Sequence, residues 1–262
     1  MDEQIDREIC IHGKEWDTFH EGYFSDTSIA APLIDKIEDA IRESCPDIIV
    51  DLGGGPGFLL CQILRRSLKN DVRLVNLDCS DAQLEIARSR GLHVLQGSID
   101  SFRRNDVGQE ERRFLYIMRS VLHYYGQQGL IPVLRHIRSQ SREGELFVHQ
   151  TASFEHTREA ACMNLLYKKM HTIKWYPTVQ ELSGCLLNTG WSVLSVSHVG
   201  ALPLRSHDLE KRYHLDKRDI RDICDGITTK AEEIDKVLSL YEGGFCAYLH
   251  YHIYVCAAAP LQ

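Results

Sequence analysis

The sequence predicts an α/β fold: a mostly parallel sheet with helices on both faces and an antiparallel last strand. Short β-branched runs such as IIVDL (48–52) alternate with stretches of helical periodicity such as SDAQLEIARSRG (80–91). This alternation is typical of a parallel sheet covered on both sides. The last strand-like runs, WSVLSVSHV (191–199) and FCAYLHYHIYVCAAA (245–259), have no ordinary crossover unit between them, which favours an antiparallel edge.

Composition narrows the class of protein. The chain has 262 residues, of which 44% are hydrophobic and 26% charged, and a formal net charge of −7. These values indicate a globular protein with one large domain and argue against nucleic acid as a partner. Nine cysteines without a CxxC pair favour reduced thiols and a cytoplasmic location. The acidic N-terminus and the lack of a long apolar run predict neither a signal peptide nor a membrane partner.

The remaining elements follow from their apolar spacing. Residues 33–45 show helical spacing after Pro32, which suits a helix start. Further strands are expected at 73–79, 93–99, 112–119 and 143–150, and further helices at 57–68, 129–140, 153–171 and 178–190. We expect an N-terminal lid segment (1–31), a core (32–202), a charged helical insertion (203–242) and a last core strand (243–262). Lids commonly cover the carboxyl ends of the strands, where ligands bind in such sheets.

The stretch DIIVDLGGGPGFLL (47–60) places four glycines directly after a strand and before a helix. Glycine permits unusual dihedrals and close approach of a ligand to the backbone, and a helix N-terminus adds N–H groups. A nucleotide triphosphate loop is rejected because no lysine follows Gly57. A nicotinamide GxGxxG pattern fails, since Phe58 or Leu60 takes its third glycine position. Asp51 would also repel a pyrophosphate, so a cationic ligand without phosphate fits best, such as S-adenosylmethionine.

At this point the sequence resembles the class I S-adenosylmethionine-dependent methyltransferases, from about residue 32 to 202 and again in the last strand. The similarity implies a Rossmann-like, doubly wound, seven-stranded sheet with helical lid insertions. The motifs of that family match here as follows: Asp51, Gly53, Gly55 and Gly57 in the glycine turn; Asp78 for the ribose hydroxyls; Ser98, Ile99 and Asp100 near the adenine; Arg119 and Ser120, in MRSVLHYY (118–125), near the methionine part.

The resemblance implies in-line transfer of a methyl group to a small-molecule acceptor, at oxygen or nitrogen more than carbon. Alignment of the acceptor is the main task, and a base is needed where the acceptor carries a proton. His123 is the leading candidate base and His149 the second. Trp16 and Tyr23, in WDTFHEGYF (16–24), are expected to cover the sulfonium through cation–π contact. Lys174, Trp175 and Tyr176 resemble the part of the family that lines the acceptor pocket, and no metal site is expected.

Structural explanations of the same residues remain open. Asp51 can be a structural carboxylate, Asp78 can cap the helix after Ser80, and Asp100 can cap a short loop helix. His123 can be a buried histidine beneath the lid. A non-catalytic S-adenosylmethionine-fold regulatory or partner subunit is the alternative function, and an NAD(P)-dependent oxidoreductase is less favoured. A homodimer is compatible with the sequence.

Overall fold

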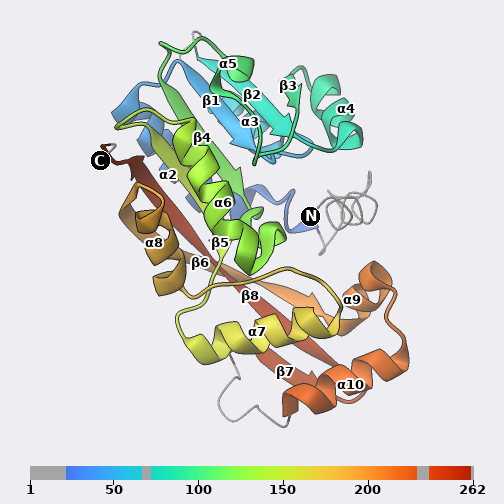
Figure 1. The fold of residues 1–262 in the computed structure, drawn as a ribbon. Helices are drawn as coiled ribbons and strands as arrows, with labels where there is room; N and C mark the ends of the chain where they lie inside the picture. The colour runs from blue at the N-terminus through green and yellow to red at the C-terminus, as the bar shows by residue number, and fades with distance from the viewer. Residues whose placement is uncertain (1–21, 67–71, 229–235, 261–262) are drawn as a thin grey trace.

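The computed structural model describes residues 22–66, 72–228 and 236–260, and Figure 1 shows its ribbon. The helices are α2 (Thr27–Ser44), α3 (Phe58–Arg65), α4 (Asp81–Ser89), α5 (Arg104–Val107), η2 (Leu122–Tyr125), α6 (Gly126–Ser139), α7 (Thr157–Lys169), α8 (Val179–Asn188), α9 (Ser206–Tyr213) and α10 (Lys217–Thr228). The strands are β1 (Ile48–Leu52), β2 (Arg73–Asp78), β3 (His93–Gln96), β4 (Phe114–Arg119), β5 (Leu146–Ala152), β6 (Trp191–Arg205), β7 (Leu238–Tyr241) and β8 (Gly244–Ala258).

The predicted sheet is confirmed. Its strand order is β3-β2-β1-β4-β5-β8-β6, with parallel pairing from β3 to β5 and with β8 antiparallel to both β5 and β6. Seven strands lie on this path, as expected. An eighth, β7, pairs with β8 off the path, so the count of seven is short by one hairpin strand.

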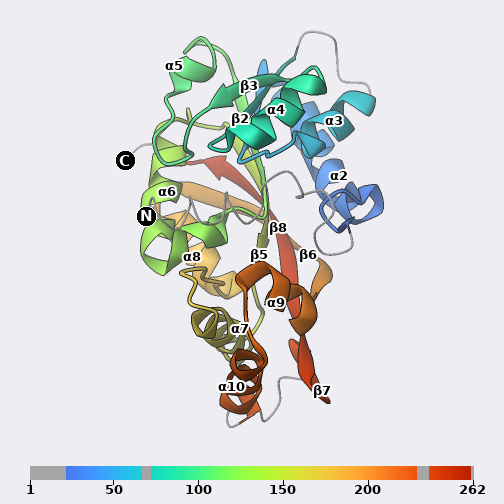
Figure 2. The same cartoon turned by 90° about the vertical axis from the view of Figure 1, so that its right-hand side faces the viewer.

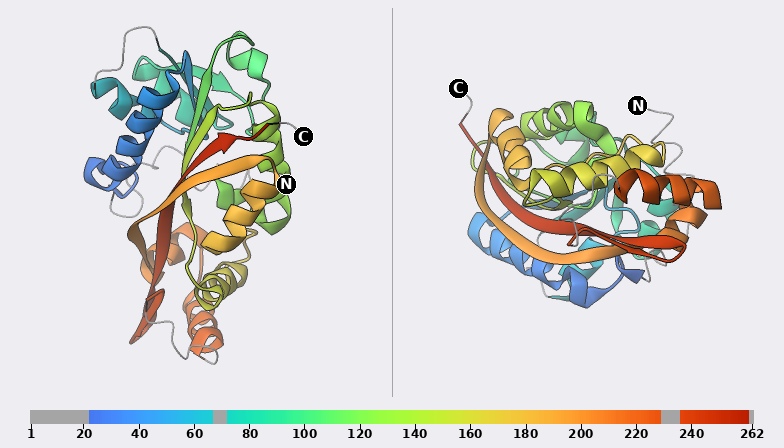
Figure 3. Two further views of the ribbon diagram at one scale, coloured as in Figure 1. Left: turned by 90° about the vertical axis from the view of Figure 1, so that its left-hand side faces the viewer. Right: turned by 90° about the horizontal axis from the view of Figure 1, so that it is seen from below.

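Helices cover both faces of the sheet, as a doubly wound fold requires (Figures 2 and 3). Apolar residues of α2, α3 and α4 form one core cluster with one face, and those of α6 and α8 form another with the opposite face. β1 and β5 are buried along their whole length, which explains why they read as nearly continuous apolar runs. Across the described ranges, every helix is too short or too polar to span a lipid bilayer.

The start of α2 differs from the prediction. Pro32 was expected at the first turn, but α2 begins at Thr27 and contains Pro32 in its interior. The Asp26 side chain caps the helix by accepting hydrogen bonds from the backbone N–H groups of Ser28 (2.7 Å) and Ile29 (3.3 Å). This cap satisfies N–H groups that a helix start otherwise leaves unpaired. The capping side chain of Asp26, and not Pro32, therefore determines where α2 begins.

Beyond the carboxyl end of β5 lies a second lobe, visible in the lower part of Figure 1. We call it the distal lobe: α7, α9, α10, β7, residues 201–205 of β6 and residues 244–250 of β8. In β8, 246–250 pair with β6 and 244–247 with β7, and these elements share their own apolar cluster. The segment 203–242 was expected to be helical. It instead starts with three residues of β6 and ends with β7, either side of α9 and α10. A register shift in the β6–β8 pairing lies between Val199 and Ala201, where β6 enters this lobe.

A buried ion pair ties the amino-terminal ends of β4 and β5 to α5. The Arg104 guanidinium donates two 2.7 Å hydrogen bonds to the Glu145 carboxylate. The same carboxylate accepts from the backbone N–H groups of Phe114 (2.8 Å) and Arg142 (2.9 Å). Every oxygen of this buried carboxylate is therefore hydrogen-bonded, which is the condition under which a buried pair is tolerated.

We predict that Glu145→Gln lowers the free energy of unfolding by about 3 kcal/mol or more, because it leaves the Arg104 charge buried without its counter-charge. Urea denaturation measures the change. The matched control is Arg88→Gln, which removes the exposed pair with Asp81 and should cost less than about 1 kcal/mol. Equal losses in the two variants would contradict the prediction.

Candidate active site

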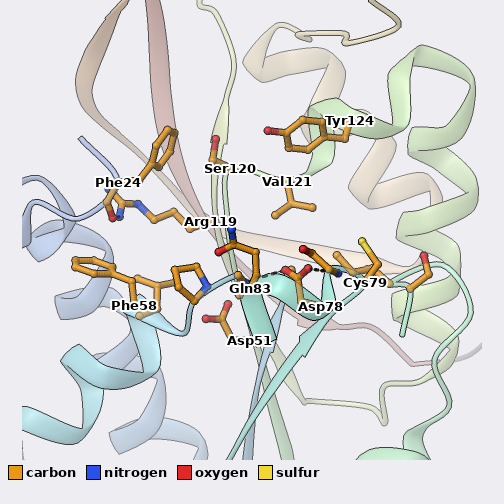
Figure 4. Close-up of a pocket in the computed structure, with 18 of the residues that line it drawn as sticks. Phe24, Asp51, Phe58, Asp78, Cys79, Gln83, Arg119, Ser120, Val121 and Tyr124 are labelled. Atoms are coloured by element: carbon orange, nitrogen blue, oxygen red, sulfur yellow. Dashed lines mark hydrogen bonds between the residues drawn. The ribbon is translucent and has the colours of Figure 1, made fainter. Parts of the chain in front are cut away.

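A cavity of about 180 Å³ lies at the carboxyl ends of β1, β2 and β4 (Figure 4). Its wall is formed by the turn after β1, the ends of β2, β3 and β4, the start of α4 and the segment before α8. Phe24, which precedes α2, completes it. This is the edge of an open α/β sheet at which ligands bind.

The glycine turn forms the floor of the cavity. Gly53, Gly55 and Gly57 have φ angles of +71°, +53° and +80°, which favour glycine because a Cβ atom is strained there. Gly54 must be glycine for a different reason: a Cβ atom at this position would overlap the Asn76 side-chain oxygen and lie 2.6 Å from the Asp51 carboxyl group. The turn therefore leaves no room for a side chain between the backbone and Asp51.

Asp51 is the last residue but one of β1, and it lines the cavity. The residue is 1% exposed, and neither carboxyl oxygen has a hydrogen-bond partner among the described residues. Burial, reinforced by the nearby charge of Asp78, raises the pKa of Asp51 to about 8, although the Arg119 charge opposes the shift. A buried carboxylate without a partner costs free energy, so this group needs a cationic or hydrogen-bond-donating ligand.

Asp78 lies across the turn from Asp51, at the end of β2. Its carboxylate accepts hydrogen bonds from the backbone N–H groups of Gly55 and Ser80, both at 2.8 Å. Burial raises the pKa of Asp78 and these N–H groups oppose the shift. The neighbouring Asn76 amide donates to the Gly55 carbonyl oxygen at 2.8 Å. β2 thus holds the turn in place through two side chains.

Arg119 brings positive charge to the cavity from the end of β4. Its guanidinium donates to the backbone carbonyl oxygens of Phe24 (2.9 Å) and Tyr23 (3.4 Å). It also lies 5.5 Å from the ring centres of both Phe24 and Phe58. Arg119 therefore fixes the segment before α2 against the cavity and partly balances the charge of Asp51.

Comparisons with known proteins agree with this geometry. No family model matches the chain. The chain is 40% identical over 60 residues to the uncharacterized methyltransferase YdaC of Bacillus subtilis (strain 168), a match covering 21% of this chain and 32% of YdaC. The matched part is thus about a third of the length of that relative.

Solved structures match over much more of the chain. A candidate methyltransferase from Bacillus halodurans C-125 superposes with a TM-score of 0.67 and 14% identity, covering 86% of this chain and all of that one. A candidate sarcosine dimethylglycine methyltransferase from Galdieria sulphuraria gives 0.56 and 10%, covering 87% and 84%. This chain has the class I methyltransferase fold. The resemblance drawn from its motifs is confirmed at this level.

The methyltransferase fold brings most of the predicted site residues to one cavity. The predicted residues that line it are Asp51, Gly53, Gly55, Asp78, Ser98, Ile99, Arg119 and Ser120. Those that lie beside it without lining it are Gly57, Asp100 and Tyr23. Gly57 instead shapes the turn, and the ring of Tyr23 stacks on Tyr251 with a centroid distance of 6.0 Å. Trp16 lies outside the described residues.

The two candidate bases do not line the cavity. The ring of His123 is buried and stacks on Tyr176 with a centroid distance of 5.3 Å. His149 lies inside the sheet against Phe147 and Tyr254, and burial lowers its pKa to about 3. His149 is therefore a neutral core histidine. Among the described residues, no cluster of histidine, cysteine and carboxylate side chains is arranged to hold a metal ion.

Several cavity residues were not predicted from the sequence. They are Phe58, Cys79, Gln83, Val121 and Tyr124. Two of them could have been predicted from their positions in the sequence. Cys79 directly follows the acid that ends β2, and Gln83 lies on the first turn of the next helix. The others depend on which way a side chain turns after its strand, which periodicity does not indicate.

We predict that Asp51→Asn stabilises the protein increasingly as the pH rises. The folded-state pKa of about 8 lies above the ordinary value of 3.8, so the neutral acid stabilises the fold below pH 4 and this contribution is lost as the pH approaches 8. The free-energy difference between variant and wild type should grow between these values, at up to about 1.4 kcal/mol per pH unit. Chemical denaturation at several pH values measures it, and a constant difference would refute the assignment.

Proposed function

We propose that the protein is an S-adenosylmethionine-dependent methyltransferase acting on a small-molecule acceptor. The observation that carries this proposal is the buried carboxyl group of Asp51, which has no partner among the described residues and faces a cavity floored by glycines. A cation or a hydrogen-bond donor in the cavity would satisfy it. A dinucleotide would place its pyrophosphate at the glycine turn beside the Asp51 carboxyl group, which repels it.

The residues fit such a donor in three places. Asp51 would attract its amino group or sulfonium, directly or through water. Asp78 keeps both carboxylate oxygens near the cavity, each with a further lone pair for the ribose hydroxyls. Ser98 and Ile99 would border the adenine, and Arg119 would face the carboxylate. When bound, the donor supplies a methyl group on a positively charged sulfur.

The protein's own contribution is positioning and exclusion of water. Phe24, Phe58 and Tyr124 line the cavity with aromatic faces, and Arg119 fixes the segment that contains Phe24. A fixed geometry of this kind lowers the activation barrier, because the entropy of bringing two reactants together is already lost on binding. The acceptor nucleophile must reach the donor from the side opposite the leaving sulfur, so the rest of the cavity wall selects the acceptor.

Two observations support a small molecule as the acceptor. The chain carries a net charge of −7, which disfavours polyanionic nucleic acid. A structural neighbour is named for methylation of sarcosine and dimethylglycine. Transfer to oxygen or nitrogen, a cytoplasmic location and the division into lid segment, core, insertion and last strand are parts of the same proposal.

We predict that S-adenosylhomocysteine binds the wild-type protein and raises its melting temperature, whereas NAD and NADP do not. Gly54→Ala should weaken S-adenosylhomocysteine binding at least about tenfold, because the new methyl group displaces the Asn76 amide, which holds the turn, and the Asp51 carboxyl group. Isothermal titration calorimetry gives both affinities. The control is Gly184→Ala in α8, where a Cβ atom meets nothing within 4 Å. Saturable NAD binding without S-adenosylhomocysteine binding would refute the proposal.

We predict that His123 supports turnover only indirectly. His123 does not line the cavity, and its ring packs against Tyr124 and Tyr176, so His123→Gln should lower kcat by less than about tenfold, below the ~10²-fold minimum for loss of a positioned base. Methyl transfer to a metabolite pool from labelled donor provides the rate. A loss of 10²-fold or more, with unchanged donor affinity, would restore His123 as the base. Donor binding without any transfer would instead favour the non-catalytic subunit.

A further inference from the structure

The cavity has two chemically different sides. Asp51 and Asp78 lie at one side, at the ends of β1 and β2, while Ser120, Phe24 and Tyr124 lie at the opposite side (Figure 4). Ile173 and Lys174, from the segment before α8, also line the cavity. The first side suits a cationic donor. The second side has a different set of polar groups, whose orientation can be read from their hydrogen bonds.

The Ser120 hydroxyl is oriented by Tyr251. Their side-chain oxygens lie 2.7 Å apart, and both residues are buried. Tyr251 Oη has no other hydrogen-bond partner among the described residues, and burial raises its pKa strongly, so it stays protonated. A buried phenol must donate its single proton or leave it unsatisfied. The phenol is satisfied when Tyr251 donates to Ser120 Oγ, and in this arrangement the Ser120 proton is left for a ligand in the cavity that Ser120 lines.

The backbone holds Ser120 at this point. Its φ angle of +60° is strained for a non-glycine residue, and its N–H donates to the Gln150 carbonyl oxygen at 2.8 Å. Strain of this kind persists where the surroundings fix it and is concentrated at ligand sites. Ser120 is therefore a rigid hydrogen-bond donor rather than a mobile surface hydroxyl.

Lys174 gives the same side of the cavity a positive charge. The residue is 6% exposed, and its ammonium donates to Tyr213 Oη at 2.6 Å and lies 4.7 Å from the ring centre of Tyr124. The rings of Tyr124 and Tyr167 lie 4.7 Å and 5.8 Å from the Lys174 ammonium. Both residues are also close enough to Tyr251 to contribute to its raised pKa. One tyrosine cluster thus surrounds both the Lys174 ammonium and the hydroxyl pair of Ser120 and Tyr251.

We propose that the acceptor carries a carboxylate, which accepts a hydrogen bond from the Ser120 hydroxyl beside the Lys174 ammonium. The proposal rests on the proposed methyl transfer and names the class of acceptor. Ser120, assigned from the sequence to the donor, is here assigned to the acceptor. A carboxylate has two oxygens, and the Lys174 ammonium and the Ser120 hydroxyl offer one donor to each.

The experiment compares 4-hydroxybenzoate, its neutral isostere 4-hydroxybenzamide and phenyl phosphate by isothermal titration calorimetry, with and without saturating S-adenosylhomocysteine. We expect the acid to bind at least about tenfold more tightly than the amide. Lys174→Met and Ser120→Gly should reduce this preference to less than about threefold, while the affinity for S-adenosylhomocysteine changes less than about threefold. Glycine is chosen because it accepts the φ angle of Ser120.

Two further variants separate orientation from packing. Tyr251→Phe keeps the ring and the Ser120 hydroxyl but removes the proton that orients it, so it should lose part of the preference for the acid. The matched control is Tyr254→Phe on the same strand, which removes an equivalent buried hydrogen bond to Ser153 Oγ (2.8 Å) and should leave the preference unchanged. An equal loss in both variants would assign the effect to packing and overturn the role of Tyr251.

Other outcomes overturn the proposal outright. Equal binding of acid and amide, or binding of neither at millimolar concentration, would remove the carboxylate. Tighter binding of phenyl phosphate would replace it with a phosphate. A tenfold loss of S-adenosylhomocysteine affinity in Ser120→Gly, with the acid preference intact, would show that Ser120 binds the methyl donor and not the acceptor. If wild type prefers the acid but never binds S-adenosylhomocysteine, the proposed function fails and the anion subsite stands.

Discussion

The structure around the cavity depends on a carboxyl group kept out of water at the end of the central strand. Asp51 is buried between β2 and β4 and has no hydrogen-bond partner among the described residues. Its neighbours are arranged so that it can remain there. Gly54 has no side chain to displace it, and Asn76 and Asp78 hold the turn from β2. A buried carboxyl group without a partner among the described residues costs stability, a compromise that active sites commonly show.

Charge is distributed unevenly over the two sides of the cavity. Acids are concentrated where β1 and β2 end, and cations where β4 ends and where the chain approaches α8. The charge difference would orient a ligand pair before detailed contacts form, because electrostatic attraction acts over longer distances than packing. Arg119 lies between the two sides and is tied to the backbone of Tyr23 and Phe24. The Arg119 guanidinium thus has two roles: it fixes the segment that covers the cavity, and it partly balances the charge of Asp51.

Local sequence patterns predicted the parts of the molecule that depend on local chemistry. The alternation of strands and helices gave the sheet and its antiparallel end, and the positions of Asp51 and Asp78 followed from acids that end buried strands. The remaining features depend on tertiary packing. His123 follows β4 and His149 lies within β5. Neither lines the cavity, and the rings of Tyr176 and Tyr254 pack against them. Ser120 and Tyr251 are 131 residues apart, and no periodicity indicates that their hydroxyl groups meet.

The register shift between Val199 and Ala201 has a consequence for how this scaffold diversifies. Two strands run from the core into the distal lobe, so the lobe cannot swing on a loose hinge and its angle is set by the pairing of those strands. One additional residue in one strand bends and twists the ladder locally. Inserting or deleting a residue at this shift would change the angle at which the distal lobe meets the core sheet. The glycine turn lies at the end of β1, far along the sheet from this shift, and would keep its geometry.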